Sequence, residues 1–141
     1  MENTAKGSCF CGAVQFSIDL PTLWCAHCHC TMCRRAHGAG FVTWVGVPRS
    51  SFHLVAGDEV LTRFKSSAKA TRSFCSRCGS TLLFESERWP GEVHVVLANF
   101  DTPIDREPAA NVYWSDRVAW AQWETRGLAA VDPDHSPGTG S

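Results

Sequence analysis

The chain has 141 residues, of which 44% are hydrophobic and 19% are charged. This length fits a single domain that can bury a core of its own. The 13 Lys and Arg residues and 14 Asp and Glu residues give a net charge of -1, which argues against a nucleic-acid partner. The most informative feature of the composition is the presence of eight cysteines.

The first residues, MENTAKGSCFCGAV, lack the basic and apolar regions of a secretory signal, and no apolar run approaches the length of a membrane span. We therefore expect a cytoplasmic protein with no membrane partner, in which thiols stay reduced. Closely spaced, reduced cysteines favour metal binding over disulfides. We assign residues 1–130 to one domain and expect the Pro-, Gly- and Ser-rich residues 131–141 to be disordered.

The hydrophobic pattern predicts many short strands separated by turns. Val14, Phe16 and Ile18 alternate with polar residues, as in a strand with one buried face. Further strands are expected at 41–47, 52–55, 60–65, 70–74, 81–85, 92–99 and 111–114. A short helix is expected at Thr31–His37, ended by Gly38. The sequence therefore predicts a small all-β fold, a sandwich or partly open barrel of antiparallel strands with one short helix.

Two cysteine pairs lie far apart in the chain, and each is followed by glycine. The first, C-F-C-G, contains Cys9 and Cys11, and the second, C-S-R-C-G, contains Cys75 and Cys78. Together they supply the four thiolates of a closed, tetrahedral structural zinc site. Such a site would tie the N-terminal strand to a distant hairpin, so that metal binding would contribute to folding.

The remaining cysteines lie in one run, C-A-H-C-H-C-T-M-C. Cys25, Cys28, Cys30 and Cys33 could together close a second structural site. Alternatively, the last three could hold the metal and leave Cys25 outside, with one position open for water or substrate, as in a catalytic zinc site. An iron–sulfur cluster is a third interpretation, but the run lacks the regular spacing and the following proline. His27 and His29 lie inside this run, and we expect their side chains to point away from the metal.

Three blocks of the sequence resemble the glutathione-dependent formaldehyde-activating enzyme family, to which a domain of centromere protein V is related. The blocks are G-S-C-F-C-G-A-V, H-C-H-C-T-M-C-R-R-A-H-G and S-F-C-S-R-C-G-S, and the similarity covers about residues 7–120. The resemblance implies a small all-β fold, similar to that of a zinc-binding chaperone of small GTPases, with two zinc ions. It implies a structural zinc on Cys9, Cys11, Cys75 and Cys78, a catalytic zinc on Cys28, Cys30 and Cys33, and no family role for Cys25.

The activity that this resemblance implies is a carbon–sulfur lyase reaction. The thiol of glutathione would add to formaldehyde, or take part in a related adduct reaction, to give S-(hydroxymethyl)glutathione. The thiolate is the nucleophile, and a metal ion in contact with the sulfur would lower the pKa of the thiol and fix its position. Glutathione and formaldehyde are thus the expected small-molecule partners; the sequence makes no prediction about oligomeric state.

Residues beside the second cysteine run could support this chemistry. Arg34 and Arg35 could offset the thiolate charge or bind a glutathione carboxylate, although a solvated helix end would carry the same residues. His37 could move a proton or donate to a ligand, and a surface histidine is equally consistent with its position. Arg72, three residues before Cys75, is expected to be a surface charge.

Aromatic residues could form the walls of a substrate pocket. Trp44, Tyr113 and Trp114 are candidates, although the core of a small β domain would use them as well. Two alternative functions remain open: a non-catalytic zinc module that binds a protein, and a redox- or metal-responsive thiol protein. Ligation by Cys25 would favour the non-catalytic module, because it would close the second site.

Overall fold

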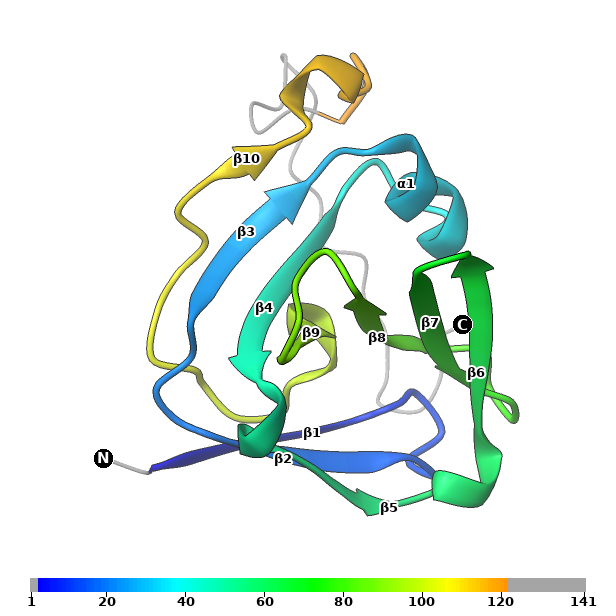
Figure 1. The fold of residues 1–141 in the computed structure, drawn as a ribbon, viewed down its shortest axis with the longest axis vertical. Helices are drawn as coiled ribbons and strands as arrows, with labels where there is room; N and C mark the ends of the chain where they lie inside the picture. Colours follow the sequence, from blue (N-terminus) through cyan, green and yellow to red (C-terminus); the bar gives the residue numbers. More distant parts are fainter. Residues whose placement is uncertain (1–2, 122–141) are drawn as a thin grey trace, which may run out of the picture.

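The computed structural model describes residues 3–121 and contains two β-sheets (Figure 1). The smaller sheet has three strands in the order β1-β2-β5 and crosses below the larger sheet in the view of Figure 1. Its strands are β1 (Thr4–Ser8), β2 (Gln15–Asp19) and β5 (Phe52–Ala56). The expected disorder of 131–141 concerns residues outside the described part of the chain.

The larger sheet has seven strands in the order β10-β3-β4-β9-β8-β7-β6. All its pairings are antiparallel except that of β10 with β3. The strands are β3 (Trp24–Cys28), β4 (Val42–Pro48), β6 (Leu61–Ser67), β7 (Ala70–Cys75), β8 (Thr81–Ser86), β9 (Glu92–Val96) and β10 (Asn111–Val112).

Helical structure is sparse. The α-helix α1 spans Thr31–His37, as the sequence predicts, and Gly38 ends it with a φ of 61°. The short 3-10 turns are η1 (Arg49–Ser51), η2 (Asp58–Val60), η3 (Leu97–Asn99) and η4 (Trp114–Asp116). Within residues 3–121, no helix is both long and apolar enough to cross a membrane.

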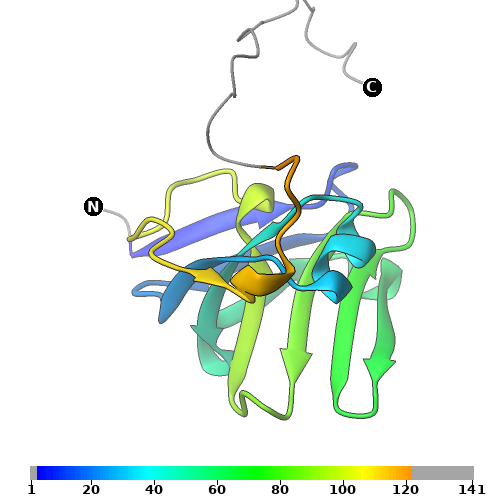
Figure 2. The same ribbon diagram turned by 90° about the horizontal axis from the view of Figure 1, so that it is seen from above.

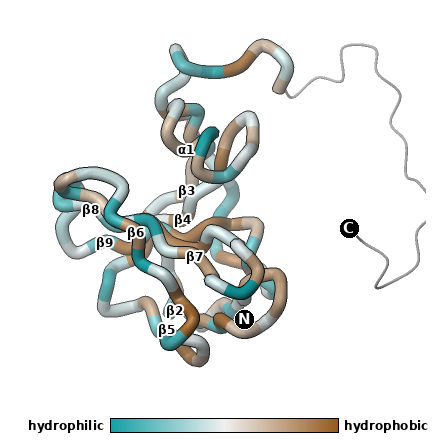
Figure 3. Tube along the Cα trace, turned by 90° about the vertical axis from the view of Figure 1, so that its right-hand side faces the viewer, coloured by the Kyte–Doolittle hydropathy of each residue, from teal (hydrophilic) through white to brown (hydrophobic). Residues whose placement is uncertain are grey.

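The main core lies between the two sheets. Phe16 on β2 is 2% exposed, and its ring stacks on Phe52 and meets Phe100 edge-on, with centroid distances of 5.8 and 5.2 Å. Val45 and Val95, paired neighbours on β4 and β9, are fully buried in the same cluster. Figure 2 shows the blue strands β1 and β2 beside the green strands of the larger sheet. In Figure 3 hydrophobic segments run through the strands, while several turns are hydrophilic.

The structure confirms the predicted fold class, a small all-β domain with one helix, but it also contains two strands that the sequence did not predict. Over residues 3–121 neither sheet closes into a barrel. The unpredicted strands are β1 and β3. The residues of β3 lack simple alternation of polar and apolar side chains because Cys25, Ala26 and Cys28 are all buried.

Candidate metal centres

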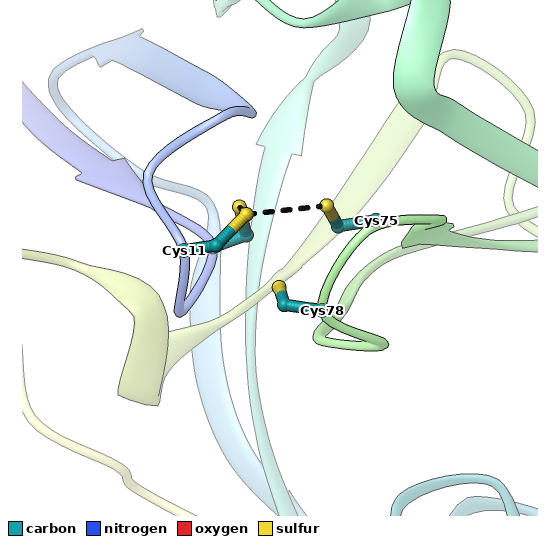
Figure 4. A group of neighbouring side chains, drawn as sticks. Cys11, Cys75 and Cys78 are labelled. Carbon is teal, nitrogen blue, oxygen red and sulfur yellow. Dashed lines mark hydrogen bonds between the residues drawn. The ribbon is translucent and has the colours of Figure 1, made fainter.

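Four cysteines from two loops converge at the first centre. Cys9 and Cys11 lie between β1 and β2, whereas Cys75 ends β7 and Cys78 lies in the turn between β7 and β8. All four Sγ atoms lie within 4.8 Å of one another; Cys11 is 3.6 Å from Cys9 and 3.8 Å from Cys75. In Figure 4 the labelled sulfurs face one another. Tetrahedral zinc with bonds of about 2.3 Å separates its sulfur ligands by about 3.8 Å. The group therefore fits a zinc ion.

The two loops are shaped for this convergence. Gly12 and Gly79, which directly follow the second cysteine of each pair, have φ values of 82° and 81°, a conformation that favours glycine. The Phe10 backbone N–H donates to Ser80 Oγ at 2.8 Å and joins the loops directly. Although burial opposes ionisation, hydrogen bonding with Ser80 lowers the pKa of Cys78 to about 6, which favours the thiolate that a metal requires.

Three cysteines form a second, separate group. Cys28 ends β3, Cys30 is the N-cap of α1, and Cys33 lies in the first turn of that helix. Their Sγ atoms lie within 4.8 Å of one another, and all three residues are buried. The Cys33 backbone N–H donates to Cys30 Sγ at 3.2 Å, so the sulfur serves as the helix cap. This group could hold a metal ion with three protein ligands.

A buried arginine accompanies the second group, which corrects the expectation that Arg72 is a surface charge. Arg72 is only 7% exposed, and its Nη2 donates to Cys33 Sγ at 3.6 Å. It is buried because β7 lies inside the sheet and strand alternation directs it to the cysteine side, where its guanidinium lies 4.8 Å from the Phe84 ring centroid. Its Nη1 is also buried and has no hydrogen-bond partner among the described residues. That orphaned donor fits an acceptor supplied by a loaded metal site or its ligand.

Hydrogen bonding and charge favour the thiolate of Cys33. A hydrogen bond from Cys28 lowers the pKa of Cys33 to about 5 against the opposing effect of burial, and Arg72 adds to the lowering. Burial, together with the side-chain hydrogen bond and the charge of Cys33, raises the pKa of Cys30. The guanidinium of Arg72 thus has the charge-offsetting position that the sequence suggested for Arg34 and Arg35.

Cys25 lies apart from the second group. It pairs in register with Val45, whereas Cys28 pairs with Val42, and an offset of three residues places the two cysteines on opposite faces of β3. Cys25 is 2% exposed and belongs to the main core between the sheets. Burial raises the pKa of this thiol, which keeps it protonated.

The histidines of this region also point elsewhere. His27 Nδ1 lies 2.7 Å from Thr43 Oγ1, and His29 Nε2 lies 2.9 Å from Asn111 Oδ1. His37 packs edge-on against Trp44, with the ring centroids 5.3 Å apart. Burial, with a contribution from Arg72, lowers the pKa of His37 to about 4, so its ring is neutral at pH 7.

The second cysteine group opens into a cavity of about 780 Å³, a size typical of small-molecule sites. The predicted Trp44 lines the cavity, and so does Tyr113. Trp114 is not among the lining residues; it packs against His29 and Arg117 instead. Other lining residues that sequence reasoning did not assign to the site include Trp24, Arg72, Phe84, Arg88, Trp89, His94 and Arg106.

The arginines of α1 do not border this cavity. Arg35 lines a smaller pocket of about 380 Å³ together with Met32 and Phe64. Arg34 is absent from the lining of both pockets. The cationic side chains that line the large cavity are instead Arg72, Arg88 and Arg106, which come from distant parts of the chain.

Comparison with known proteins finds matches of three kinds: a family model, curated relatives and solved structures. The model of the family described as "Glutathione-dependent formaldehyde-activating enzyme" matches residues 4–116. A Halomonas elongata protein named provisionally as such an enzyme is 29% identical over 86% of this chain and 82% of its own length. An uncharacterized lyase of Schizosaccharomyces pombe is 35% identical over 56% of each chain. A crystal structure of a Rhodobacter sphaeroides protein matches with a TM-score of 0.62 and 27% identity, covering 75% of this chain and 98% of that one.

Proposed function

The chain belongs to the glutathione-dependent formaldehyde-activating enzyme family, and from that premise we propose that it joins the glutathione thiol to formaldehyde at a zinc ion held by Cys28, Cys30 and Cys33. The observation that carries the proposal is that Cys28, Cys30 and Cys33 bring their sulfurs together beside a large cavity, whereas Cys25, which also borders that cavity, is outside the group and packs in the main core. Three protein ligands beside a cavity leave one coordination position for substrate.

The metal, when bound, supplies Lewis acidity that lowers the pKa of a thiol in contact with it. The chain's own contribution is charge and position. Three thiolates and a divalent ion carry a net charge of -1, and Arg72 offsets it through the bond from Nη2 to Cys33 Sγ. The helix cap formed by Cys30 fixes that sulfur relative to Cys33.

The reaction itself is an addition. The thiolate sulfur of glutathione forms a bond to the carbonyl carbon of formaldehyde, the π electrons of the carbonyl move to oxygen, and that oxygen takes up a proton. Holding both reactants in one cavity converts a bimolecular encounter into a local one. The reverse reaction breaks the same carbon–sulfur bond, which is why the activity is classed as a lyase.

Two arginines could hold the carboxylates of the tripeptide. Arg106 lines the cavity and is itself fixed by donating to the Thr22 carbonyl at 2.6 Å and to Thr22 Oγ1 at 2.8 Å. Arg88 lines the same cavity and lies 5.0 Å from the Trp89 ring centroid. These positions replace Arg34 and Arg35 as our candidates for carboxylate binding.

We assign the other centre a structural role. Cys9, Cys11, Cys75 and Cys78 complete a tetrahedral set without an open position. The proposed enzyme thus uses two zinc ions, one for folding and one for the reaction. The proposal places it in the cytoplasm, where the thiols that hold both metals stay reduced.

The test is a rate measurement on reduced, zinc-loaded protein. Formation of S-(hydroxymethyl)glutathione is followed by NMR exchange spectroscopy at several enzyme concentrations and compared with the uncatalysed background. We expect a rate proportional to enzyme for the wild type and for Cys25→Ala, and none above background for Cys30→Ser. An equal rate in Cys30→Ser and wild type would contradict the proposal.

A further inference from the structure

Four ring-bearing side chains line one side of the large cavity, and we call them the aromatic wall: Trp24, Phe84, Trp89 and His94. His94 is central. Its ring centroid lies 4.6 Å from that of Trp24, 5.5 Å from that of Trp89 and 5.7 Å from that of Phe84. Burial lowers the pKa of His94, so that its neutral form fits among these rings.

The aromatic wall is fixed in place by residues behind it. One carboxylate oxygen, Glu92 Oε1, accepts from both His94 Nε2 at 2.9 Å and Trp24 Nε1 at 3.2 Å. Gly46 lies opposite Trp24 on the neighbouring strand, and a Cβ there would lie 2.2 Å from the indole. The glycine therefore allows the indole to lie directly against the sheet. A wall held in this way is preorganised for a ligand.

One side chain, that of Arg72, connects the aromatic wall to the second cysteine group. Arg72 donates to Cys33 Sγ at 3.6 Å, and the same guanidinium lies 4.8 Å from the ring centroid of Phe84. Strand register continues this connection, because Arg72, Phe84 and His94 are paired in one row across β7, β8 and β9. A group attached to the carbon that reacts near Cys33 would thus meet the rings.

The adduct of glutathione and formaldehyde has nothing that matches this wall. It carries carboxylates, an ammonium group, amides and a hydroxymethyl group, and polar groups lose free energy when they are buried against apolar rings without partners. The carboxylates suit Arg88 and Arg106 at the same cavity. A planar aromatic ring, by contrast, gains from edge-to-face and stacked contacts with rings already arranged in that way.

We infer that the aromatic wall binds an aromatic ring on the aldehyde carbon, so that the enzyme accepts aromatic aldehydes as well as formaldehyde. This inference rests on the proposed glutathione-binding role. The thiolate sulfur bonds to the carbonyl carbon, the π electrons move to oxygen, and the oxygen takes a proton from water, which yields a hemithioacetal with the ring beside the new carbon–sulfur bond. No oxidant or reductant is involved.

Two stable thioethers test the inference by binding rather than turnover. S-benzylglutathione places a ring where the aldehyde substituent would lie, and S-methylglutathione lacks it. With zinc-loaded full-length protein, calorimetry should show at least about tenfold tighter binding of the benzyl compound, as expected for burial of one aromatic ring. Trp89→Ala and Phe84→Leu should abolish most of that preference. Trp120→Ala is the matched control, because Trp120 is 75% exposed and does not line the cavity.

The outcomes separate this inference from the proposed function. Equal affinity for the two thioethers, or a preference that persists in Trp89→Ala, would overturn the aromatic subsite and leave the glutathione role in place. If neither thioether binds, benzyl alcohol is the second probe. Its binding in the wild type, lost in Trp89→Ala, would support the aromatic subsite. No binding of any of the three would overturn the aromatic subsite. The glutathione role is judged separately, by whether free glutathione binds to the same zinc-loaded protein, because the thioethers lack the thiolate on which that role depends.

Discussion

Cys25 and Cys28 lie three residues apart on β3 and face opposite sides of the sheet. This relationship divides the cysteine run, because Cys28 meets Cys30 and Cys33 beside the cavity while Cys25 is buried with Val45 in the main core. An interaction module with two closed zinc sites would require Cys25 as a fourth ligand. The observed arrangement favours a three-thiolate centre.

The first prediction concerns Cys25→Ala. We expect this variant to keep two zinc ions per chain and to lose about 1 kcal/mol of unfolding free energy, as for a small truncation in a core. Metal analysis by mass spectrometry and urea unfolding measure the two quantities. Loss of one zinc ion in this variant would show that Cys25 is a ligand.

The two centres should respond differently to removal of one sulfur. Cys75 is fully buried and joins the β7–β8 turn to the N-terminal loop, so Cys75→Ser should lose most of the folded protein, because a structural zinc contributes on the order of 10 kcal/mol. Cys30→Ser should remain folded with one zinc ion. Circular dichroism and metal content distinguish the cases. Soluble, folded Cys75→Ser with two zinc ions would refute the assignment.

Arg72 should control the affinity of the second metal. Replacing a residue that donates to a ligand sulfur typically weakens metal binding roughly tenfold to a hundredfold. Because Arg72 donates to Cys33 Sγ, Arg72→Gln should weaken zinc binding by this factor at the second centre and leave the first centre unchanged. Arg72→Lys, which keeps the charge, should recover part of the loss. Competition with a chromophoric chelator measures the affinity. Arg63→Gln is the control, since Arg63 is exposed and pairs with Asp58 in the preceding turn η2.

His37 should make stability depend on pH. Because its pKa falls from 6.5 to about 4 on folding, the unfolded chain binds more protons between those values. Stability should therefore be highest above pH 6.5 and fall as the pH drops toward 4, by about 2 kcal/mol after allowance for solvent screening.

The measurement for His37 is urea unfolding of wild type and His37→Gln between pH 4 and 7. The difference between the two proteins isolates His37 from loss of metal in acid, and the stability of the wild type relative to His37→Gln should rise as the pH increases from 4 to 7. The exposed His53 provides the control, as His53→Gln should follow the wild type. If the unfolding free energy changed with pH in the same way in all three proteins, the prediction would be contradicted.

The sequence predicted the helix and the fold class, because hydrophobic period and glycine positions are local signals. Cysteine spacing indicated Cys9, Cys11, Cys75 and Cys78 as one group, but it left the part of Cys25 in the second run open, and only the family resemblance separated Cys25 from Cys28, Cys30 and Cys33.

The sequence did not predict the burial of Arg72, which depends on strands that flank β7 after folding. Two further features of the site could have been predicted from strand alternation. In a strand over residues 24–28, side chains alternate between the two faces, so Cys25 and Cys28 would lie on opposite faces. The same alternation in β9 places Glu92 and His94 on one face.

The central claim is that the centre on Cys28, Cys30 and Cys33 is open and binds the glutathione thiol. Native mass spectrometry of the reduced protein, with and without glutathione, tests it most directly. The account predicts two zinc ions per chain, a glutathione adduct in wild type and in Cys25→Ala, and neither the adduct nor the second zinc in Cys30→Ser. Two zinc ions with no glutathione adduct in the wild type would contradict it.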